Sequence, residues 1–385
     1  MGNEKDDNSK YKLDGVNIAA GDVFSRYCNE INKSTYGLSP YVSVADLSRG
    51  NFRGPKGFVF KHLPKGYLIT GAMDGIGTKV TVIVASGKVV TSASNVIAMT
   101  AMDITRWGGL PLVFMNIFDA RTFGEIDSET FKLCQEVMDG LKDIAHEHKY
   151  VLFNGESAEL GLCVGSENPD AKLMFNWGGA MLGVYHPSKM ILGDTLAPGQ
   201  IVIALRDGGR SNGYSTFRKS LAMKYGPEWW NNLDALEDII ACASPSAQYD
   251  RLLNTAHGWF SENPLQSLIK MDLIVHLSGG AFESKLGEDI LKPLNLSAEL
   301  DDLFEPPEIM KKCAQWRGMT PRECYKTWNG GQGAIVVVDE CEVKAFLTMA
   351  KEFNVEAKRV GRITEKKEHT VLIKSKFGDG TLLPY

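Results

Sequence analysis

The sequence MDGIGTK carries the residue types that bind a phosphorylated ligand. Gly75 and Gly77 let the backbone turn tightly and approach an anion, while Thr78 and Lys79 add a hydroxyl group and a cation. Asp74 adds a hard oxygen ligand that suits Mg²⁺. The spacing is neither that of a P-loop nor GxGxxG. Because a plain hairpin turn uses the same residues, the segment alone leaves both interpretations open.

Three further acidic residues lie at places where a site could form. Asp103 falls within an otherwise apolar helical pattern, and Glu156 and Glu159 follow a strand pattern in a glycine-containing loop. Several carboxylates in one site repel each other unless a divalent cation neutralises them. Such a group would suit a nucleotide-bound Mg²⁺, although a residue of this kind taken alone is more often a solvated or capping side chain.

Glycine-rich segments recur along the chain and offer backbone N–H groups to an anion. The basic stretch Ser48–Gly57 could close over phosphates during transfer, or be an ordinary surface loop. Gly208–Ser215 leads into a helical pattern, so it could present a phosphate site or simply cap that helix. His276–Gly280 and Asn329–Gly333 adjoin strand patterns and could equally be turns.

The elements that must position these residues alternate between strands and helices, which favours an α/β architecture. We predict helices from Ser92 or Ser94 to about Ile104, from near Asp127 to Ala145, and over Phe217–Lys224. Predicted strands are Tyr67–Ala72, Val80–Ala85, Tyr150–Phe153, Ile201–Leu205, Asp272–Leu277 and Ala334–Asp339. The turn-rich stretch Gly193–Gly199 predicts a boundary between domains 1–192 and 193–385.

Composition limits the partners of this 385-residue chain. Its 42 Lys and Arg against 47 Asp and Glu give a formal net charge of −5 with no dense basic block, so nucleic acid is not an expected partner. Apolar runs are strand-sized, which predicts no membrane span. The seven cysteines are scattered without a CxxC pair, so we expect a reducing, cytoplasmic location rather than a disulfide framework.

Taken in order, five segments resemble motifs of the aminoimidazole ribonucleotide synthetase family (phosphoribosylformylglycinamidine cyclo-ligase). MDGIGTK is similar to that family's DGVGTK, and NGESAEL to its GGETAEM. RSNGYSTFRK is similar to HSNGYSLVRK, HLSGG to HLTGGG, and YKTWNGGQG to YRTFNxGxG. Five ordered matches over most of the chain are far more specific than any one of them.

The resemblance implies an α/β fold of two domains. The first (1–192) would bind ATP and Mg²⁺ and would pair its sheet with that of a second subunit into a barrel, making a homodimer. The second (193–385) would complete the substrate cleft. The implied reaction uses ATP to phosphorylate the formamide oxygen of formylglycinamidine ribonucleotide, after which the amidine nitrogen closes the imidazole ring of aminoimidazole ribonucleotide. This is a step of purine biosynthesis.

The resemblance also assigns roles to particular residues. It implies that Asp74, Asp103 and Glu156 hold Mg²⁺, and that Lys79, Asp103 and Asn212 are catalytic. Its remaining assignments are grouped by ligand. ATP would contact Asp74, Gly75, Gly77, Thr78, Lys79 and Gly155, and the substrate would contact Arg210, Ser211, Asn212 and Gly213.

This chain departs from the family pattern at four places. Arg210 stands where the family usually has His, and Met102 replaces the Asn before Asp103. Ala281 replaces a third glycine, and the usual Glu-Asn pair is absent in register at Ser284-Lys285. These changes bear on the substrate more than on ATP use. The alternatives are therefore another ATP-using member of the same superfamily, or a non-catalytic nucleotide-binding paralogue that regulates other enzymes.

Overall fold

The computed structural model describes residues 17–210 and 212–385, which divide into two compact units. The described part of the first unit comprises residues 17–63, 71–100 and 111–183. The second comprises 64–70, 101–110 and 184–385. Two short segments of the N-terminal half thus belong to the second unit, while the division at 192/193 stays a prediction.

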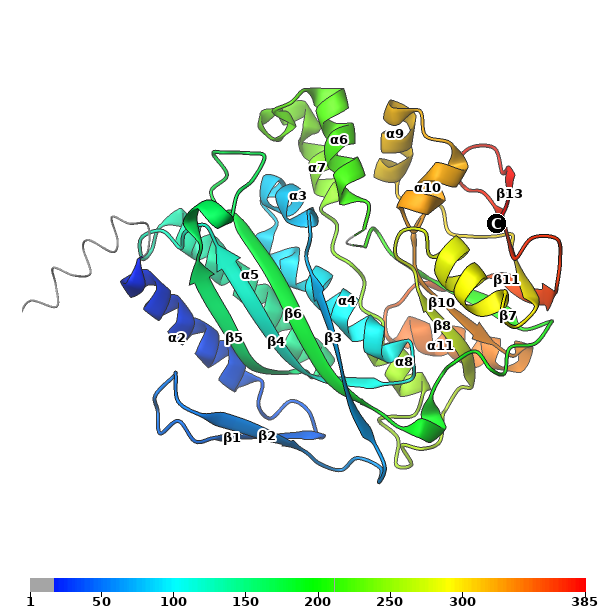
Figure 1. The fold of residues 1–385 in the computed structure, drawn as a ribbon, viewed down its shortest axis with the longest axis horizontal. Helices are drawn as coiled ribbons and strands as arrows, with labels where there is room; N and C mark the ends of the chain where they lie inside the picture. The colour runs from blue at the N-terminus through cyan, green and yellow to red at the C-terminus, as the bar shows by residue number, and fades with distance from the viewer. Residues whose placement is uncertain (1–16, 211) are drawn as a thin grey trace, which may run out of the picture. The chain divides into compact units, whose positions relative to one another are not determined.

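A four-stranded sheet in the order β3-β6-β4-β5 forms the centre of the first unit. Its strands are β3 (Leu68–Gly75), β4 (Leu110–Ala120), β5 (Val151–Glu159) and β6 (Phe175–Tyr185), and a separate hairpin pairs β1 (Val42–Asp46) with β2 (Lys56–Phe60). The helices are α2 (Ile18–Ser34), α3 (Lys79–Ser86), α4 (Ser92–Thr105) and α5 (Glu129–His148). Helix α2 packs against β5 and α5 (Figure 1). Strands β4 and β5 run parallel, with Ile117 paired to Glu156.

Helix α5 forms where the sequence predicts it, because its apolar side chains recur at helical spacing. Ser128 caps its N-terminus by accepting a hydrogen bond from the Phe131 amide at 3.2 Å. The buried face includes Phe131, Cys134, Met138, Leu141 and Ala145. On α2, Phe24 packs on Phe118 and Phe123 with ring centroids 5.7 and 4.9 Å apart. This aromatic contact fixes α2 over the sheet.

Two predictions about the first unit are wrong. The run Val80–Ala85 is not a strand but the body of helix α3. Its β-branched residues favour a strand locally, yet the buried side chains Lys79, Val82, Ile83 and Ser86 recur at helical spacing, so burial on one face overrides local preference. Residues 154–159 are not a loop either, because they continue strand β5 beside β4.

The second unit is built on a seven-stranded sheet in the order β13-β12-β9-β11-β7-β10-β8. Its strands are β7 (Ile201–Arg206), β8 (Met271–His276), β9 (Leu296–Leu300), β10 (Gln332–Val338), β11 (Ala357–Glu365), β12 (Val371–Lys374) and β13 (Leu382–Pro384). The predicted strands in this half are confirmed to within a few residues. Strands β7, β8 and β10 are almost entirely buried, which explains their continuous apolar runs.

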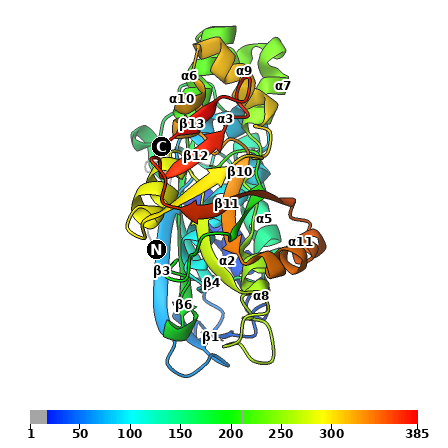
Figure 2. The same ribbon diagram turned by 90° about the vertical axis from the view of Figure 1, so that its right-hand side faces the viewer.

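Helices cover this sheet. They are α6 (Tyr214–Tyr225), α7 (Leu236–Cys242), α8 (Asp250–Ala256), α9 (Glu308–Arg317), α10 (Pro321–Thr327), α11 (Val343–Glu352) and a π-helix, η6 (Phe282–Leu291). Helix α11 lies against β11 and α8 (Figure 2), and its Phe346 joins the core formed by α8 and strands β7 and β10. None of the helices in the described residues combines the length and apolar character that crossing a membrane requires.

Candidate functional site

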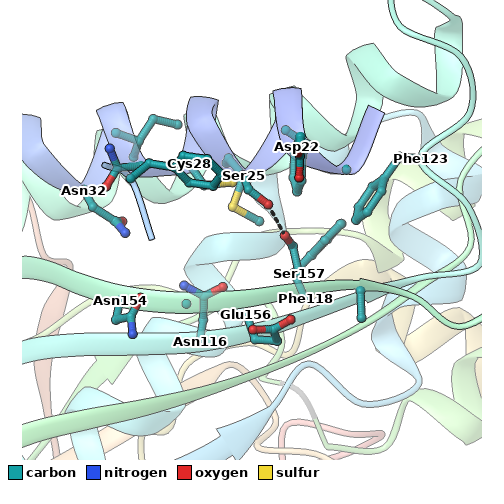
Figure 3. Close-up of a pocket in the computed structure, with 18 of the residues that line it drawn as sticks. Asp22, Ser25, Cys28, Asn32, Asn116, Phe118, Phe123, Asn154, Glu156 and Ser157 are labelled. Atoms are coloured by element: carbon teal, nitrogen blue, oxygen red, sulfur yellow. Dashed lines mark hydrogen bonds between the residues drawn. The ribbon is translucent and has the colours of Figure 1, made fainter. Parts of the chain in front are cut away.

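A cavity of about 550 Å³ lies in the first unit between α2 and strands β4 and β5 (Figure 3). Helix α2 forms one wall, and the loop between β1 and β2 contributes Phe52 and Arg53. Ser25 of α2 and Ser157 of β5 meet across the cavity at 3.2 Å between their hydroxyl oxygens. A pocket of this size is typical of a small-molecule site.

Side-chain amides dominate the polar lining of this cavity. They are Asn29, Asn32, Asn116 and Asn154. An amide offers donors and an acceptor together, so such a lining can match the edges of a heterocyclic base. Asn116 is held in place because its Oδ1 accepts a hydrogen bond from Trp177 Nε1 at 3.1 Å. Asn17 also lines the cavity, together with the carboxylates of Asp22, Glu156 and Glu159, so amides and charged groups share the polar lining.

Positive charge enters the cavity from the β1–β2 segment. Arg53 pairs with Asp22 on α2, and Lys56 Nζ donates to Asn29 Oδ1. Burial lowers the pKa of Lys56, while the nearby carboxylate of Asp46 opposes that effect. The basic stretch singled out in the sequence thus brings two cations to this cavity, where they could bind an anionic ligand.

Glu156 and Glu159 have different surroundings although they lie three residues apart. The carboxylate of Glu159 accepts hydrogen bonds from the Phe123 amide at 2.7 Å and from Thr122 Oγ1 at 3.0 Å, so it fastens β5 to the chain after β4. Glu156 is exposed, and its register with Ile117 points its side chain away from α2 (Figure 3). Of these two glutamates, Glu156 is the one whose carboxylate stays available for a ligand.

The MDGIGTK motif occupies the end of β3 and the start of α3. Asp74 Oδ1 accepts a hydrogen bond from the Gly75 amide at 2.7 Å. Gly77 has φ +60°, a conformation that favours glycine, and exposed Thr78 takes the cap position of α3. Lys79 is completely buried as the first residue of that helix. The tight turn at Gly77 and the helix that starts after it are features that a phosphate-binding segment can use. The sequence did not predict that Lys79 is buried.

Within the first unit, two of the residues predicted to share one Mg²⁺, Asp74 and Glu156, do not lie together. Asp74 and Glu156 lie on the two edge strands of one sheet, three strand spacings or about 14 Å apart. Asp103 belongs to the second unit. No group of three His, Cys, Asp or Glu side chains among the described residues is placed to hold a metal ion. The three-carboxylate ligand set therefore stays a prediction.

A second polar cluster lies at one edge of the seven-stranded sheet in the second unit. Strand β10 pairs with β7 and β8, with Gln332 opposite Arg206 and Ala334 opposite His276. Both pairings are antiparallel, so the C-terminal ends of β7 and β8 lie beside the N-terminal end of β10. We call this side of the sheet, where the three strands end or begin, the sheet edge. The three glycine-rich segments of the second half all leave the sheet there, which confirms that the sequence singled out neighbouring loops.

A buried ion pair forms the first part of this cluster. Arg210 Nε lies 2.9 Å from Asp207 Oδ2, and the side chains are 1% and 0% exposed. The guanidinium group stacks on the ring of Tyr249 at 4.9 Å. Asp207 Oδ1 accepts hydrogen bonds from the amides of Gly208 and Ala247 at 2.8 and 3.1 Å. Arg210, predicted as a substrate contact, is thus a fixed and fully buried cation.

His276 and Asp103 form the second part. His276 Nδ1 lies 3.5 Å from Asp103 Oδ1, and Arg106 Nε lies 3.8 Å from the same oxygen. Burial lowers the pKa of His276 to about 4, against the raising effect of Asp103. Burial raises the pKa of Asp103, but His276 and the surrounding positive charges outweigh it and leave that pKa below its usual value. At neutral pH the pair is a neutral imidazole beside a carboxylate.

The remaining predicted substrate contacts follow Arg210. Ser211 lies outside the described residues, and Asn212 is exposed. Gly213 has φ +78° and begins helix α6, and a side chain there would collide with the Thr327 carbonyl and the Trp328 ring. Glycine is therefore required at this position for packing, whatever it contributes to a ligand.

Sequence reasoning missed the amides of the first cavity and Lys285 beside His276. The signal for the first was present, because Asp22, Ser25, Asn29 and Asn32 recur at helical spacing and form a polar stripe on the inner face of α2. Lys285 carries no such signal, since a lysine on a helix is usually solvated. Only the fold brings its Nζ within 2.9 Å of Ser278 Oγ.

Comparison with known proteins agrees with this architecture. The sequence model of the AIR synthase related protein N-terminal domain matches residues 57–182, and that of its C-terminal domain matches residues 266–374. The chain is 26% identical to the phosphoribosylformylglycinamidine cyclo-ligases of Staphylococcus carnosus (strain TM300) and Staphylococcus aureus (strain Newman). Each alignment covers 94% of this chain and 97% of the relative.

Solved structures of similar fold are more distant in sequence. Thiamine-monophosphate kinase from Stenotrophomonas maltophilia K279a has a TM-score of 0.54 at 13% identity, covering 84% of this chain and 90% of the other. The hydrogenase maturation protein HypE, solved in complex with ATP, has a TM-score of 0.53 at 13% identity, covering 83% and 85%. T. maritima PurL complexed with FGAR has a TM-score of 0.51 at 12% identity, covering 83% and 45%. These likenesses establish the fold alone.

Proposed function

We propose that this chain, which belongs to the AIR synthase related family, is an ATP-dependent cyclo-ligase that converts formylglycinamidine ribonucleotide to aminoimidazole ribonucleotide. The observation that carries the proposal is the nearly end-to-end match to two relatives named for that activity. Of the motifs that this match spans, NGESAEL lines the cavity under α2 and MDGIGTK joins β3 to α3. The other three lie at the edge of the seven-stranded sheet.

The cavity under α2 is the proposed site for ATP. Its amides suit the base and ribose, and Arg53 and Lys56 suit the phosphates. The fold accommodates ATP in at least one relative, since HypE was solved with it. Gly155 lines this cavity. Gly75, Gly77, Thr78 and Lys79 remain proposed nucleotide contacts, although none of them is among the residues that line the cavity.

Magnesium fits this proposal as part of the nucleotide complex. Mg²⁺ is usually held by one or two carboxylates together with substrate phosphates and water, so a closed cage of three carboxylates is not required. Asp74 and Glu156 each offer such a carboxylate, and Asp103 remains a proposed ligand of the second unit. The ion would neutralise charge on the transferred phosphoryl group.

The protein's own residues would mainly position the reactants and exclude water. In the proposed reaction the formamide oxygen takes the γ-phosphoryl group of ATP and releases ADP. The amidine nitrogen then attacks the same carbon, and inorganic phosphate leaves as the ring closes. Lys79, Asp103 and Asn212 are the proposed catalytic residues, and Arg210, Ser211, Asn212 and Gly213 the proposed substrate contacts.

A homodimer is part of the proposal. Ile117 is 52% exposed on the sheet face away from α2, and Met73 of β3 is 79% exposed. Apolar side chains exposed on a sheet are typical of a surface that another subunit covers. Pairing this face with the same face of a second copy would give the barrel that the family resemblance implies.

Turnover of the purified protein tests the proposal directly. We expect ADP and the aminoimidazole product to form together only when formylglycinamidine ribonucleotide, ATP and Mg²⁺ are all present, as followed by coupled ADP detection and chromatography of the product. ATP binding without any turnover would favour the non-catalytic paralogue. Turnover with a different phosphorylated acceptor would favour another member of the superfamily.

A further inference from the structure

The guanidinium group of Arg210 keeps hydrogen-bonding capacity that its ion pair does not use. Its Nε faces Asp207, yet Nη1 and Nη2 have no hydrogen-bond partner among the described residues, although the side chain is 1% exposed. Asp207 Oδ1 is already occupied by two backbone amides. Because an arginine stays charged and its terminal nitrogens form a planar fork, such a group is arranged to bind an oxyanion.

Lys285 brings a second cation to the same edge of the sheet. It lies on the π-helix η6, and its Nζ donates to Ser278 Oγ at 2.9 Å and to the His276 carbonyl at 3.4 Å. The positive charges of Arg210 and Lys285 both lower the pKa of His276, in addition to its burial. The two cations therefore approach one imidazole from two different segments, the loop after β7 and the π-helix η6.

The charge balance at this edge leaves room for an anion. Asp103 is engaged by His276 and Arg106, and Asp207 is engaged by Arg210 and two amides. Among the arginine, lysine and aspartate side chains named here, three cations (Arg106, Arg210 and Lys285) face two carboxylates. Asn329 on the neighbouring loop is 3% exposed, and its Nδ2 has no hydrogen-bond partner among the described residues. The groups named here that lack a hydrogen-bond partner are thus N–H donors, on Arg210 and Asn329.

The departures from the family pattern fall into two kinds once they are placed in the structure. Met102 is 1% exposed and packs in the core of the second unit. Ala281 has φ −67°, so no glycine is needed there. Arg210 and Lys285, by contrast, each put a permanent positive charge where the family pattern has His and Asn. The changes at Met102 and Ala281 are thus accommodated by packing and backbone conformation. The changes at Arg210 and Lys285 add positive charge at the sheet edge.

We propose that Arg210 and Lys285 together form an oxyanion site for the phosphate ester of the ribonucleotide substrate, and that these two replacements adapt this chain to hold that group with two cations. This inference rests on the proposed function for the identity of the substrate, but the anion site itself does not depend on turnover. The phosphate would accept hydrogen bonds from the Arg210 fork and from Lys285, with the loop amides completing its surroundings.

Calorimetric titration of the full chain with ribose 5-phosphate tests the proposal, with ribose as the uncharged comparison. We expect ribose 5-phosphate to bind and ribose not to bind. Lys285→Asn and Arg210→His, which restore the family residues, should each weaken ribose 5-phosphate at least tenfold. ATP affinity should remain within about twofold, which also shows that each variant is folded. Lys292→Asn is the matched control, because Lys292 caps the C-terminal end of the same helix and pairs with Glu288 at 2.6 Å on the surface.

Each other outcome has a definite meaning. If ribose 5-phosphate fails to bind, or binds equally well to both variants, the site is refuted, even if the wild-type chain turns over formylglycinamidine ribonucleotide. If binding depends on Arg210 and Lys285 while no cyclo-ligase turnover occurs, the anion site stands and the proposed reaction fails. Should Arg210→His also lose ATP binding, Lys285→Asn alone decides the outcome.

Discussion

In the first unit the polar side chains line a hollow, whereas in the second they pack around one another. The cavity under α2 is floored by amides, and its cations Arg53 and Lys56 come from a partly exposed segment. At the sheet edge of the second unit, Asp207, Arg210 and His276 are almost completely buried. A cavity lined by partly exposed polar groups suits a ligand that binds and dissociates. A buried ion pair suits a charged contact whose position does not change.

The two regions also differ in how closely they keep the family pattern. Asp74, Gly75, Gly77, Thr78 and Lys79 keep the DGxGTK pattern in the first unit. The four departures instead lie beside or within the sheet-edge segments of the second unit. The first unit also departs from the pattern, since NGESAEL stands where the family has GGETAEM, but those replacements add no charge. The replacements that add charge, Arg210 and Lys285, both lie in the second unit.

Removing Asp207 would test the claim that the second region is held by buried charge, and we expect the largest effect there. Asp207→Ala leaves the buried Arg210 cation without its partner, so the free energy of unfolding should fall by about 3–5 kcal/mol. Urea unfolding followed by circular dichroism measures this. Asp302→Ala is the control, because that carboxylate is 58% exposed and pairs with Lys358 and Lys376, so its loss should cost below about 1 kcal/mol. Equal effects of the two substitutions would break the contrast between the regions.

The Asp74 carboxylate tests whether the first region takes part in catalysis. Asp74→Asn keeps an acceptor for the Gly75 amide but removes the charge, so the fold should persist. We expect kcat to fall about 100-fold, the scale of losing one preorganised electrostatic contact. Asp46→Asn, at an exposed carboxylate of the same unit, should leave kcat unchanged. An unaltered rate for Asp74→Asn at saturating Mg²⁺ would remove Asp74 from the metal site.

Much of the fold could be predicted from the sequence, because its longest elements have regular apolar patterns. Helix α5 and strands β7, β8 and β10 were predicted to within a few residues. Helix α3 was not, because five β-branched residues favour a strand locally and only the packed structure shows that one face of a helix is buried. Strand β4 was missed entirely, although its first half is a continuous apolar run.

The site was less predictable than the fold, because side chains far apart in the sequence had to be placed together. The sequence identified Arg210 and His276 within separate glycine-rich segments, and the antiparallel pairing of β10 with β7 and β8 brings those segments to one edge. It could not show that Lys285 reaches the same place, since this depends on the π-helix after β8. Nor could spacing reveal that Asp74 and Glu156 lie on opposite edges of their sheet.

Replacing Lys56 should have the smallest of these effects, and it tests whether the cavity of the first unit binds the nucleotide. Lys56→Ala removes a cation from the lining and its hydrogen bond to Asn29, so ATP affinity should fall about tenfold, the scale of one charge-assisted hydrogen bond. Because Lys56 is only partly buried, the loss should shrink as salt is raised, which calorimetry at two ionic strengths would show. Lys33→Ala serves as the control, since Lys33 pairs with the exposed carboxylate of Glu30 and is not among the residues that line the cavity. If both variants bind ATP within twofold of the wild type, the nucleotide does not place its phosphates beside the β1–β2 loop, and the cavity under α2 loses its proposed role.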